Sequence, residues 1–84
     1  MCTILVIDDE KCILRVIREA LIRFGHNVEI AFDGIEGIKK FDDGSYDMVI
    51  TDMRMPRLDG KGVVQHIRKS RKNSIPVLGI SGTP

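Results

Sequence analysis

Three aspartates follow directly on short apolar runs of the sequence. Asp8 and Asp9 come after residues 3–7, and Asp52 comes after residues 47–51. If both runs are neighbouring strands of one parallel sheet, their carboxylates meet at the carboxyl edge of that sheet. Two carboxylates about 6 Å apart repel by roughly 3 kcal/mol at an effective dielectric of about 20. A divalent cation removes that penalty, and an all-oxygen site with access to water suits Mg²⁺.

The same cation would allow one of these aspartates to act as a nucleophile. A carboxylate that attacks a phosphoryl group approaches an anion, and Mg²⁺ screens both reactants and stabilises the transferring oxygens. Asp52 is the candidate nucleophile, and its product is an acyl phosphate. The alternative is that Asp8 and Asp9 only cap the following helix and that Asp52 only begins a turn. Three acids together at strand ends favour the joint site.

The elements that must position these aspartates alternate along the chain. Short β-rich runs and helical runs follow one another, which predicts an α/β domain with a parallel sheet. Strands are expected at residues 3–7, 27–31, 47–51 and 76–80, and helices at 11–24, after the capping residue Asp33, and at 60–69 after Asp59. The side chains expected to face the core from the helices are Ile13, Leu14, Ile17, Ala20, Leu21 and Phe24, then Ile35, Ile38 and Phe41, and then Val63, Val64 and Ile67.

Length, charge and cysteine content limit the class of protein. The 84 residues suffice for one domain, and the net charge of +1 provides no field that predicts nucleic acid or an anionic membrane as a partner. The apolar run near the start is too short to span a bilayer or to serve as a signal sequence, so the expected location is the cytoplasm. Cys2 and Cys12 are expected to be reduced packing residues rather than a disulfide or part of a zinc site.

Four motifs together resemble the response-regulator receiver domain. They are residues 4–10, residues 47–52, Met55-Pro56-x-x-Asp59-Gly60 and residues 75–81, in the order and at the spacing of that family. The resemblance extends over essentially all 84 residues. It implies a flavodoxin-like, doubly wound parallel sheet of βα repeats with strand order 2-1-3-4, and a role as the phosphoacceptor switch of a two-component phosphorelay.

The resemblance also assigns roles to individual residues. Asp52 would take the phosphoryl group from a histidine kinase or phosphotransfer protein. Asp8, Asp9 and Asp52 would hold Mg²⁺ (or Mn²⁺), with Asp8 acting largely through water and the Arg54 backbone carbonyl supplying a further oxygen. Ser81 matches the hydroxyl residue that bonds a phosphoryl oxygen. The Arg54 side chain is expected either to approach the phosphoryl oxygens or Asp8, or to remain solvated.

In the family, the chain continues past Ser81 with a helix, a strand that ends in a Lys-Pro pair, and a final helix. Residues 1–84 are therefore interpreted as a receiver domain that lacks this helix-strand-helix portion. Without the fifth strand, the fourth becomes an edge, and Val77, Leu78 and Ile80 are apolar for such a position. Two expectations follow: the chain self-associates through this strand, or it is part of a longer protein.

Other functions remain as alternatives. A receiver-like interaction module that is not phosphorylated would explain the missing lysine, although the complete acidic set argues against it. A phosphatase of the haloacid dehalogenase type fits poorly, because the first strand is followed by adjacent aspartates rather than Asp-x-Asp. The basic run at residues 68–72 is better explained as a solvated helix end than as a nucleic-acid contact. If the chain is an enzyme, its activity is limited to Mg²⁺-dependent self-phosphorylation and autodephosphorylation.

Overall fold

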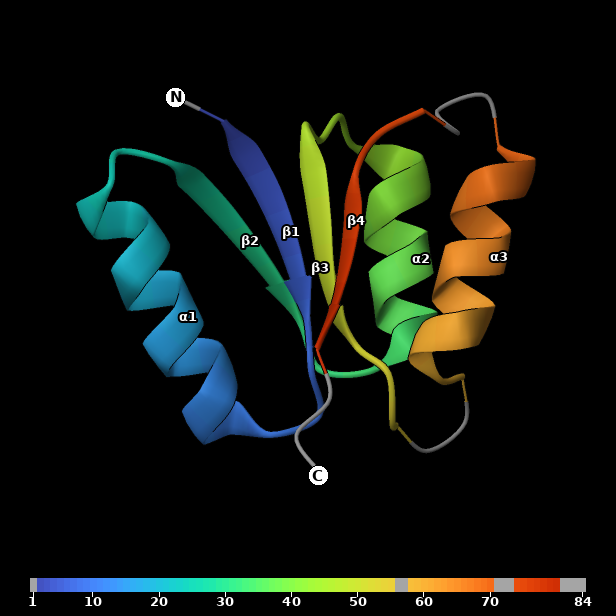
Figure 1. Ribbon diagram of the computed structural model, residues 1–84, viewed down its shortest axis with the longest axis horizontal. Helices are drawn as coiled ribbons and strands as arrows, with labels where there is room; N and C mark the ends of the chain where they lie inside the picture. The colour runs from blue at the N-terminus through green and yellow to red at the C-terminus, as the bar shows by residue number, and fades with distance from the viewer. Residues whose placement is uncertain (1, 56–57, 71–73, 81–84) are drawn as a thin grey trace.

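The computed structural model describes residues 2–55, 58–70 and 74–80 of the chain. Its elements are β1 (Thr3–Ile7), α1 (Lys11–Arg23), β2 (Asn27–Ala31), α2 (Gly34–Asp43), β3 (Met48–Asp52), α3 (Gly60–Lys69) and β4 (Val77–Ile80). The strands are all parallel and lie in the order β2-β1-β3-β4. Helix α1 covers one face of the sheet, and α2 and α3 cover the other (Figure 1). The expected α/β class and strand order are confirmed.

The central strand β1 is buried along nearly its whole length. Its residues Ile4 to Ile7 are at most 3% exposed, because strands flank it on both sides and helices cover both faces. Alternate side chains of β1 therefore enter two separate cores. The core under α2 and α3 contains Leu5, Ile7, Ala31, Phe41, Val49, Met55, Val63 and Ile67, and the core under α1 contains Ile4, Val6, Leu14 and Ile50.

Short polar residues begin two of the helices, as the sequence predicts. The Asp33 side chain accepts a hydrogen bond from the Glu36 N–H (2.7 Å), and the Asp59 side chain accepts one from the Gly62 N–H (3.0 Å). Each bond satisfies a backbone donor that the first helical turn leaves unpaired. After α1 the chain turns at Gly25, whose φ of 87° suits glycine. The caps fix α2 and α3 at the edge of the sheet where β1 and β3 end.

The predicted inner faces of the helices are partly wrong. Ile13 is 40% exposed and Phe24 is 80% exposed, and Ala20 is exposed as well. The side of α1 that packs on the sheet is formed by Leu14 with the partly buried Ile17 and Leu21. At about 100° per residue, positions 13, 20 and 24 lie close together around the helix axis, but on the side of Ile17 that faces away from Leu14 and Leu21. The inner stripe is therefore narrower than the apolar pattern predicts.

Smaller differences concern α2 and the strand bounds. Ile35 is 50% exposed, whereas Phe41 is buried and Ile38 is partly buried as expected. Strand β3 begins one residue later than predicted and extends to Asp52, and β4 begins at Val77 rather than at Pro76. None of the described helices combines the length and the apolar character that a membrane span requires.

Candidate metal centre

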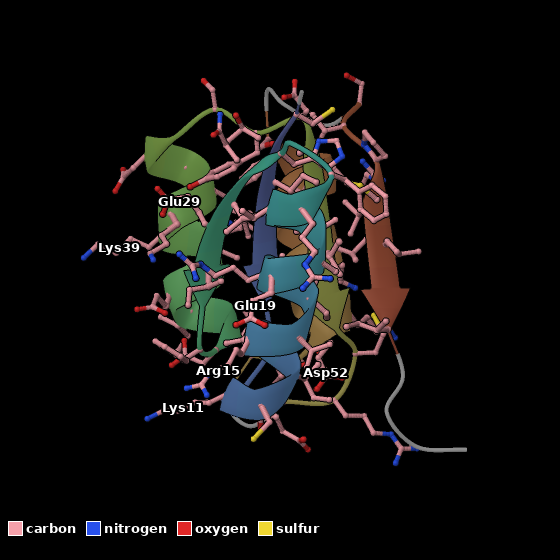
Figure 2. All side chains as sticks on the ribbon, turned by 90° about the vertical axis from the view of Figure 1, so that its left-hand side faces the viewer. Lys11, Arg15, Glu19, Glu29, Lys39 and Asp52 are labelled. Carbon is pink, nitrogen blue, oxygen red and sulfur yellow. The ribbon has the colours of Figure 1, made fainter. Side chains whose placement is uncertain are left out.

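Strands β1 and β3 bring the three predicted aspartates together. In their register, Ile7 pairs with Thr51, so Asp8 and Asp52 are the next residues on adjacent strands. Asp8, Asp9 and Asp52 each offer one carboxylate oxygen, and these three atoms lie within 4.8 Å of one another. Figure 2 shows Asp52 at the same end of the fold as Lys11, the first residue of α1. The convergence expected from the strand ends is therefore present.

Asp8 is the buried member of the cluster. It is 3% exposed, and its Oδ1 accepts a hydrogen bond from the Glu10 N–H (3.0 Å). Burial raises the pKa of Asp8 from 3.8 to about 6; the Glu10 hydrogen bond lowers it, and the charges of Asp52 and Asp9 raise it further. Asp8 is not a helix cap, because α1 begins after Glu10 and its cap residue forms no side-chain bond.

Two hydrogen bonds hold Asp52 at the end of β3, and a third holds the next residue, Met53. Its Oδ1 accepts a hydrogen bond from the Arg54 N–H (3.1 Å), and its carbonyl accepts one from the buried Thr51 hydroxyl (3.0 Å). The Met53 N–H donates to the Ile80 carbonyl (3.0 Å), which ties the following residue to β4. The Asp52 side chain remains only partly buried, so a reactant from solvent can reach it.

Two glycines allow the segment after Asp52 to pack closely. A Cβ on Gly60 would lie 2.5 Å from the Asp52 carbonyl oxygen and 2.6 Å from the Met53 Cα. A Cβ on Gly34 would collide with the backbone carbonyl of Leu58. The sequence predicts Gly60 as the first residue of a helix. Its contact with the backbone of Asp52 joins residues from different elements, so no local sequence pattern predicts that contact. Gly37 packs against the Ile7 side chain, and a Cβ there would lie 2.4 Å from the Ile7 Cδ1.

The contacts that two further site residues, Arg54 and Ser81, are predicted to make with a phosphoryl group remain predictions. The Arg54 side chain is exposed and, within the described part of the chain, forms no ion pair with Asp8. Its approach to a phosphoryl group therefore stays a prediction. Ser81 lies outside the described residues. The strand that leads to it is in place, because Ile80 pairs with Asp52 across β4 and β3.

The donor set fits a hard divalent cation. All three side chains are carboxylates, one from the buried end of β1, one from the exposed residue beside it, and one from β3. Oxygen ligands and an open side toward water are what Mg²⁺ prefers in proteins. The raised pKa of Asp8 also reflects the charges of its neighbours, which a cation would offset.

Comparisons with known proteins agree with this geometry. The family model described as "Response regulator receiver domain" matches residues 4–84. The chain is 40% identical over 75 residues to the probable transcriptional regulator ycf27 of Cyanidium caldarium, which covers 89% of the chain and 29% of that protein. It is 39% identical over 77 residues to the uncharacterized transcriptional regulatory protein YcbL of Bacillus subtilis, covering 92% of the chain and 33% of that protein. The chain thus spans about a third of the length of these curated relatives.

Solved structures show the same fold. The chemotaxis protein CheY4 of Vibrio cholerae superposes with a TM-score of 0.93 at 29% identity, over 100% of this chain and 71% of that one. The response regulator TrrA of Thermotoga maritima, solved in complex with Mg²⁺-BeF, superposes with a TM-score of 0.92 at 37% identity, over 99% and 71% of the two chains. The family match over residues 4–84, the shared fold and the converging aspartates lead to one conclusion: the chain belongs to the response regulator receiver domain family of two-component signalling.

Proposed function

We propose that this receiver domain is the phosphoacceptor of a two-component phosphorelay, and that Asp52 receives the phosphoryl group. The observation that carries the proposal is the approach of Asp8, Asp9 and Asp52 to within 4.8 Å of one another at the ends of β1 and β3. Of the three aspartates, Asp52 is the one at the end of β3. Its side chain is partly exposed and its backbone carbonyl is hydrogen-bonded, so a nucleophile at this position would be both accessible and held in place. The related TrrA, which was solved in complex with Mg²⁺-BeF, supports the proposal.

The reaction would transfer one phosphoryl group between two side chains. A carboxylate oxygen of Asp52 forms a bond to phosphorus while the bond from phosphorus to the nitrogen of a donor phosphohistidine breaks, and the released imidazole takes up a proton. The Arg54 N–H, bonded to Oδ1, holds the Asp52 carboxylate in a fixed orientation during the attack. Water later hydrolyses the acyl phosphate and restores Asp52.

Asp8 and Asp9 would hold Mg²⁺ together with Asp52, and we assign the Arg54 carbonyl as a further ligand. The ion would supply positive charge to the transferring oxygens. Asp8, with its raised pKa, must lose its proton before it can contribute a full negative charge. Ser81 is proposed as the hydroxyl that bonds a phosphoryl oxygen. The proposed metal is Mg²⁺, with Mn²⁺ as a substitute of the same ligand preference.

The proposed phosphodonor is a histidine kinase or a phosphotransfer protein, and the proposed compartment is the cytoplasm. A second copy of this chain is a further proposed partner, through β4. In the described part of the sheet β4 pairs only with β3, and its Leu78 is 50% exposed. An apolar edge strand of this kind tends to pair with another strand.

Titration of the chain with Mg²⁺, followed by the amide signals of Asp8, Asp9 and Asp52, tests the metal site. We expect saturable shifts in the parent chain, and loss of saturation in Asp9→Asn and Asp52→Asn. The matched control is Asp43→Asn, which removes an exposed carboxylate at the end of α2. Equal Mg²⁺ affinity in all four chains would leave the acidic cluster without a metal role and would favour an interaction module that is not phosphorylated.

A further inference from the structure

A groove whose lining includes none of the three aspartates runs between α1 and the free edge of β2. It has a volume of about 470 Å³, and its lining includes four basic residues, Lys11, Arg15, Arg18 and Lys40, against one acidic residue, Glu29. In Figure 2, Lys11 and Arg15 extend from α1 to the side on which β2 and Glu29 lie. The groove is thus positively charged, although the whole chain has a net charge of only +1.

Most of these cations lack a carboxylate partner. Lys40 lies 3.8 Å from Glu29, whereas Lys11, Arg15 and Arg18 form no ion pair among the residues that the structure describes. The three residues follow the spacing i, i+4, i+7, so they form one stripe along α1. Three like charges in a row repel one another, and an anionic group in the groove would relieve that repulsion.

The floor of the groove is apolar. Leu14 is buried, Val28 and Ile30 are partly buried, and Phe32 is 43% exposed at one end, where the Lys11 ammonium lies 5.8 Å from the ring centre. A ligand that matches the groove therefore has apolar groups as well as negative charge. Single-stranded nucleic acid fits less well, because it requires several aromatic side chains for stacking, and Phe32 is the only aromatic residue in the described lining.

The β2 backbone supplies hydrogen-bonding groups along the same groove. Toward β1, the Asn27 N–H donates to the Cys2 carbonyl (2.8 Å), and the Ala31 carbonyl accepts from the Asp8 N–H (3.1 Å). In a parallel ladder, alternate residues bond to the same neighbour, so the N–H and C=O groups of Val28 and Ile30 point to the open edge. The Ile30 carbonyl accepts a hydrogen bond from the Lys40 Nζ (2.6 Å), which agrees with a carbonyl that points away from β1.

We propose that the α1–β2 groove binds an extended acidic segment of a partner protein, which adds to the sheet as a strand beside β2. Backbone bonds at Val28 and Ile30 would hold the segment, and its side chains on the α1 face would meet Arg15 and Arg18. A carboxylate of the segment would pair with the Lys40 ammonium, and the Ile30 carbonyl would then accept a backbone hydrogen bond from the segment in place of the bond from Lys40. This site uses none of the three aspartates, so its test does not depend on the proposed phosphorylation.

The test uses a synthetic peptide of about seven alternating glutamate and valine residues, the length of an ordinary strand. Titrated into the ¹⁵N-labelled chain, it is expected to shift the amides of Val28 and Ile30 most strongly and to slow their hydrogen exchange. Arg15→Glu and Arg18→Glu, both exposed positions, should each lower the affinity about tenfold. Lys69→Glu makes the same charge change on α3, outside the groove, and should leave the affinity unchanged.

Three results would overturn the proposal. One is the absence of saturable shifts at Val28 and Ile30. Another is equal affinity for the same peptide N-methylated at alternate residues, which cannot form the strand bonds. The third is equal affinity for a single-stranded oligonucleotide, which would show a general anion-binding surface instead of a peptide site. Glu29→Gln provides an independent check, because removing the one acidic residue of the lining should tighten peptide binding.

Discussion

The Asp8 carboxylate is buried at 3% exposure, yet one of its oxygens lies within 4.8 Å of an Asp52 oxygen. An ionised carboxylate in that position loses hydration and faces a like charge, and both effects raise its pKa, to about 6. The arrangement costs folding free energy in the chain without a metal. The proposed cation would offset that cost, so the metal-free chain would be less stable and the site would gain affinity for the metal.

Replacing Asp8 by asparagine should separate these two effects. Asp8→Asn keeps an oxygen for the Glu10 N–H but removes the buried charge, so the free energy of unfolding without Mg²⁺ should rise by about 1–3 kcal/mol at pH 7.5. Mg²⁺ affinity should fall at least about tenfold. Urea denaturation with and without Mg²⁺ measures both quantities. The control Asp9→Asn, at an exposed position, should lose Mg²⁺ affinity without the gain in stability; a similar gain in both variants would contradict the account.

The pH dependence of stability follows from the same carboxyl group. Its pKa is 3.8 in the unfolded reference and about 6 in the fold, so between these values the folded chain binds more protons than the unfolded chain. Stability from this group is therefore complete below about pH 4 and is lost as the pH rises to about 6, by up to about 3 kcal/mol. Denaturation midpoints of the parent and Asp8→Asn, compared from pH 4 to 7.5 without Mg²⁺, isolate this contribution. Parallel curves for the two chains would refute it.

A side chain at Gly60 should destabilise the fold, because Gly60 packs against the backbone at the end of β3. The Cβ of Gly60→Ala would meet backbone atoms of Asp52 and Met53, which cannot move as a flexible side chain can. We expect a loss of about 1–3 kcal/mol in stability and weaker Mg²⁺ binding. Gly62→Ala in the same helix meets chiefly the flexible end of the Leu58 side chain and should be neutral or stabilising. Calorimetric melting of both variants makes the comparison, and equal losses would argue against the contact.

Association through β4 should depend on Leu78. Leu78→Lys places a charge on the exposed edge strand without emptying the core, because Leu78 is 50% exposed. Sedimentation equilibrium over a range of concentrations should show self-association of the parent chain and a monomer for this variant. Val16→Lys, at a 65% exposed apolar position on α1, should still self-associate. A monomeric parent at high concentration would remove the proposal.

The convergence of the acidic residues could be predicted from the sequence because it follows from a local pattern. Asp8, Asp9 and Asp52 stand at the ends of apolar runs, and parallel strands place such ends together. The helix caps at Asp33 and Asp59 could also be predicted from the sequence, since each side chain accepts a hydrogen bond from an N–H only three residues away. The secondary structure and the strand order followed from the same alternation and from the family resemblance.

Features that depend on packing between distant segments were not predictable in this way. Helical periodicity showed that α1 has an apolar side but could not fix its width, so Ile13 and Phe24 were wrongly expected in the core. The contact of Gly60 with Asp52 and the groove along β2 arise from the placement of whole elements. The burial of Asp8, and with it the raised pKa, depends on neighbours that the sequence does not identify.

The most direct test of the central claim is covalent phosphorylation of the chain. Incubation with acetyl phosphate and Mg²⁺, followed by intact-mass and peptide mass spectrometry, should show one phosphoryl group on Asp52. The modification should disappear when Mg²⁺ is chelated and in Asp52→Asn, and it should be removed by hydroxylamine, as an acyl phosphate is. If Mg²⁺ binds at the cluster but no phosphoryl group is found, or if the group is found on a residue other than Asp52, the proposed function is wrong.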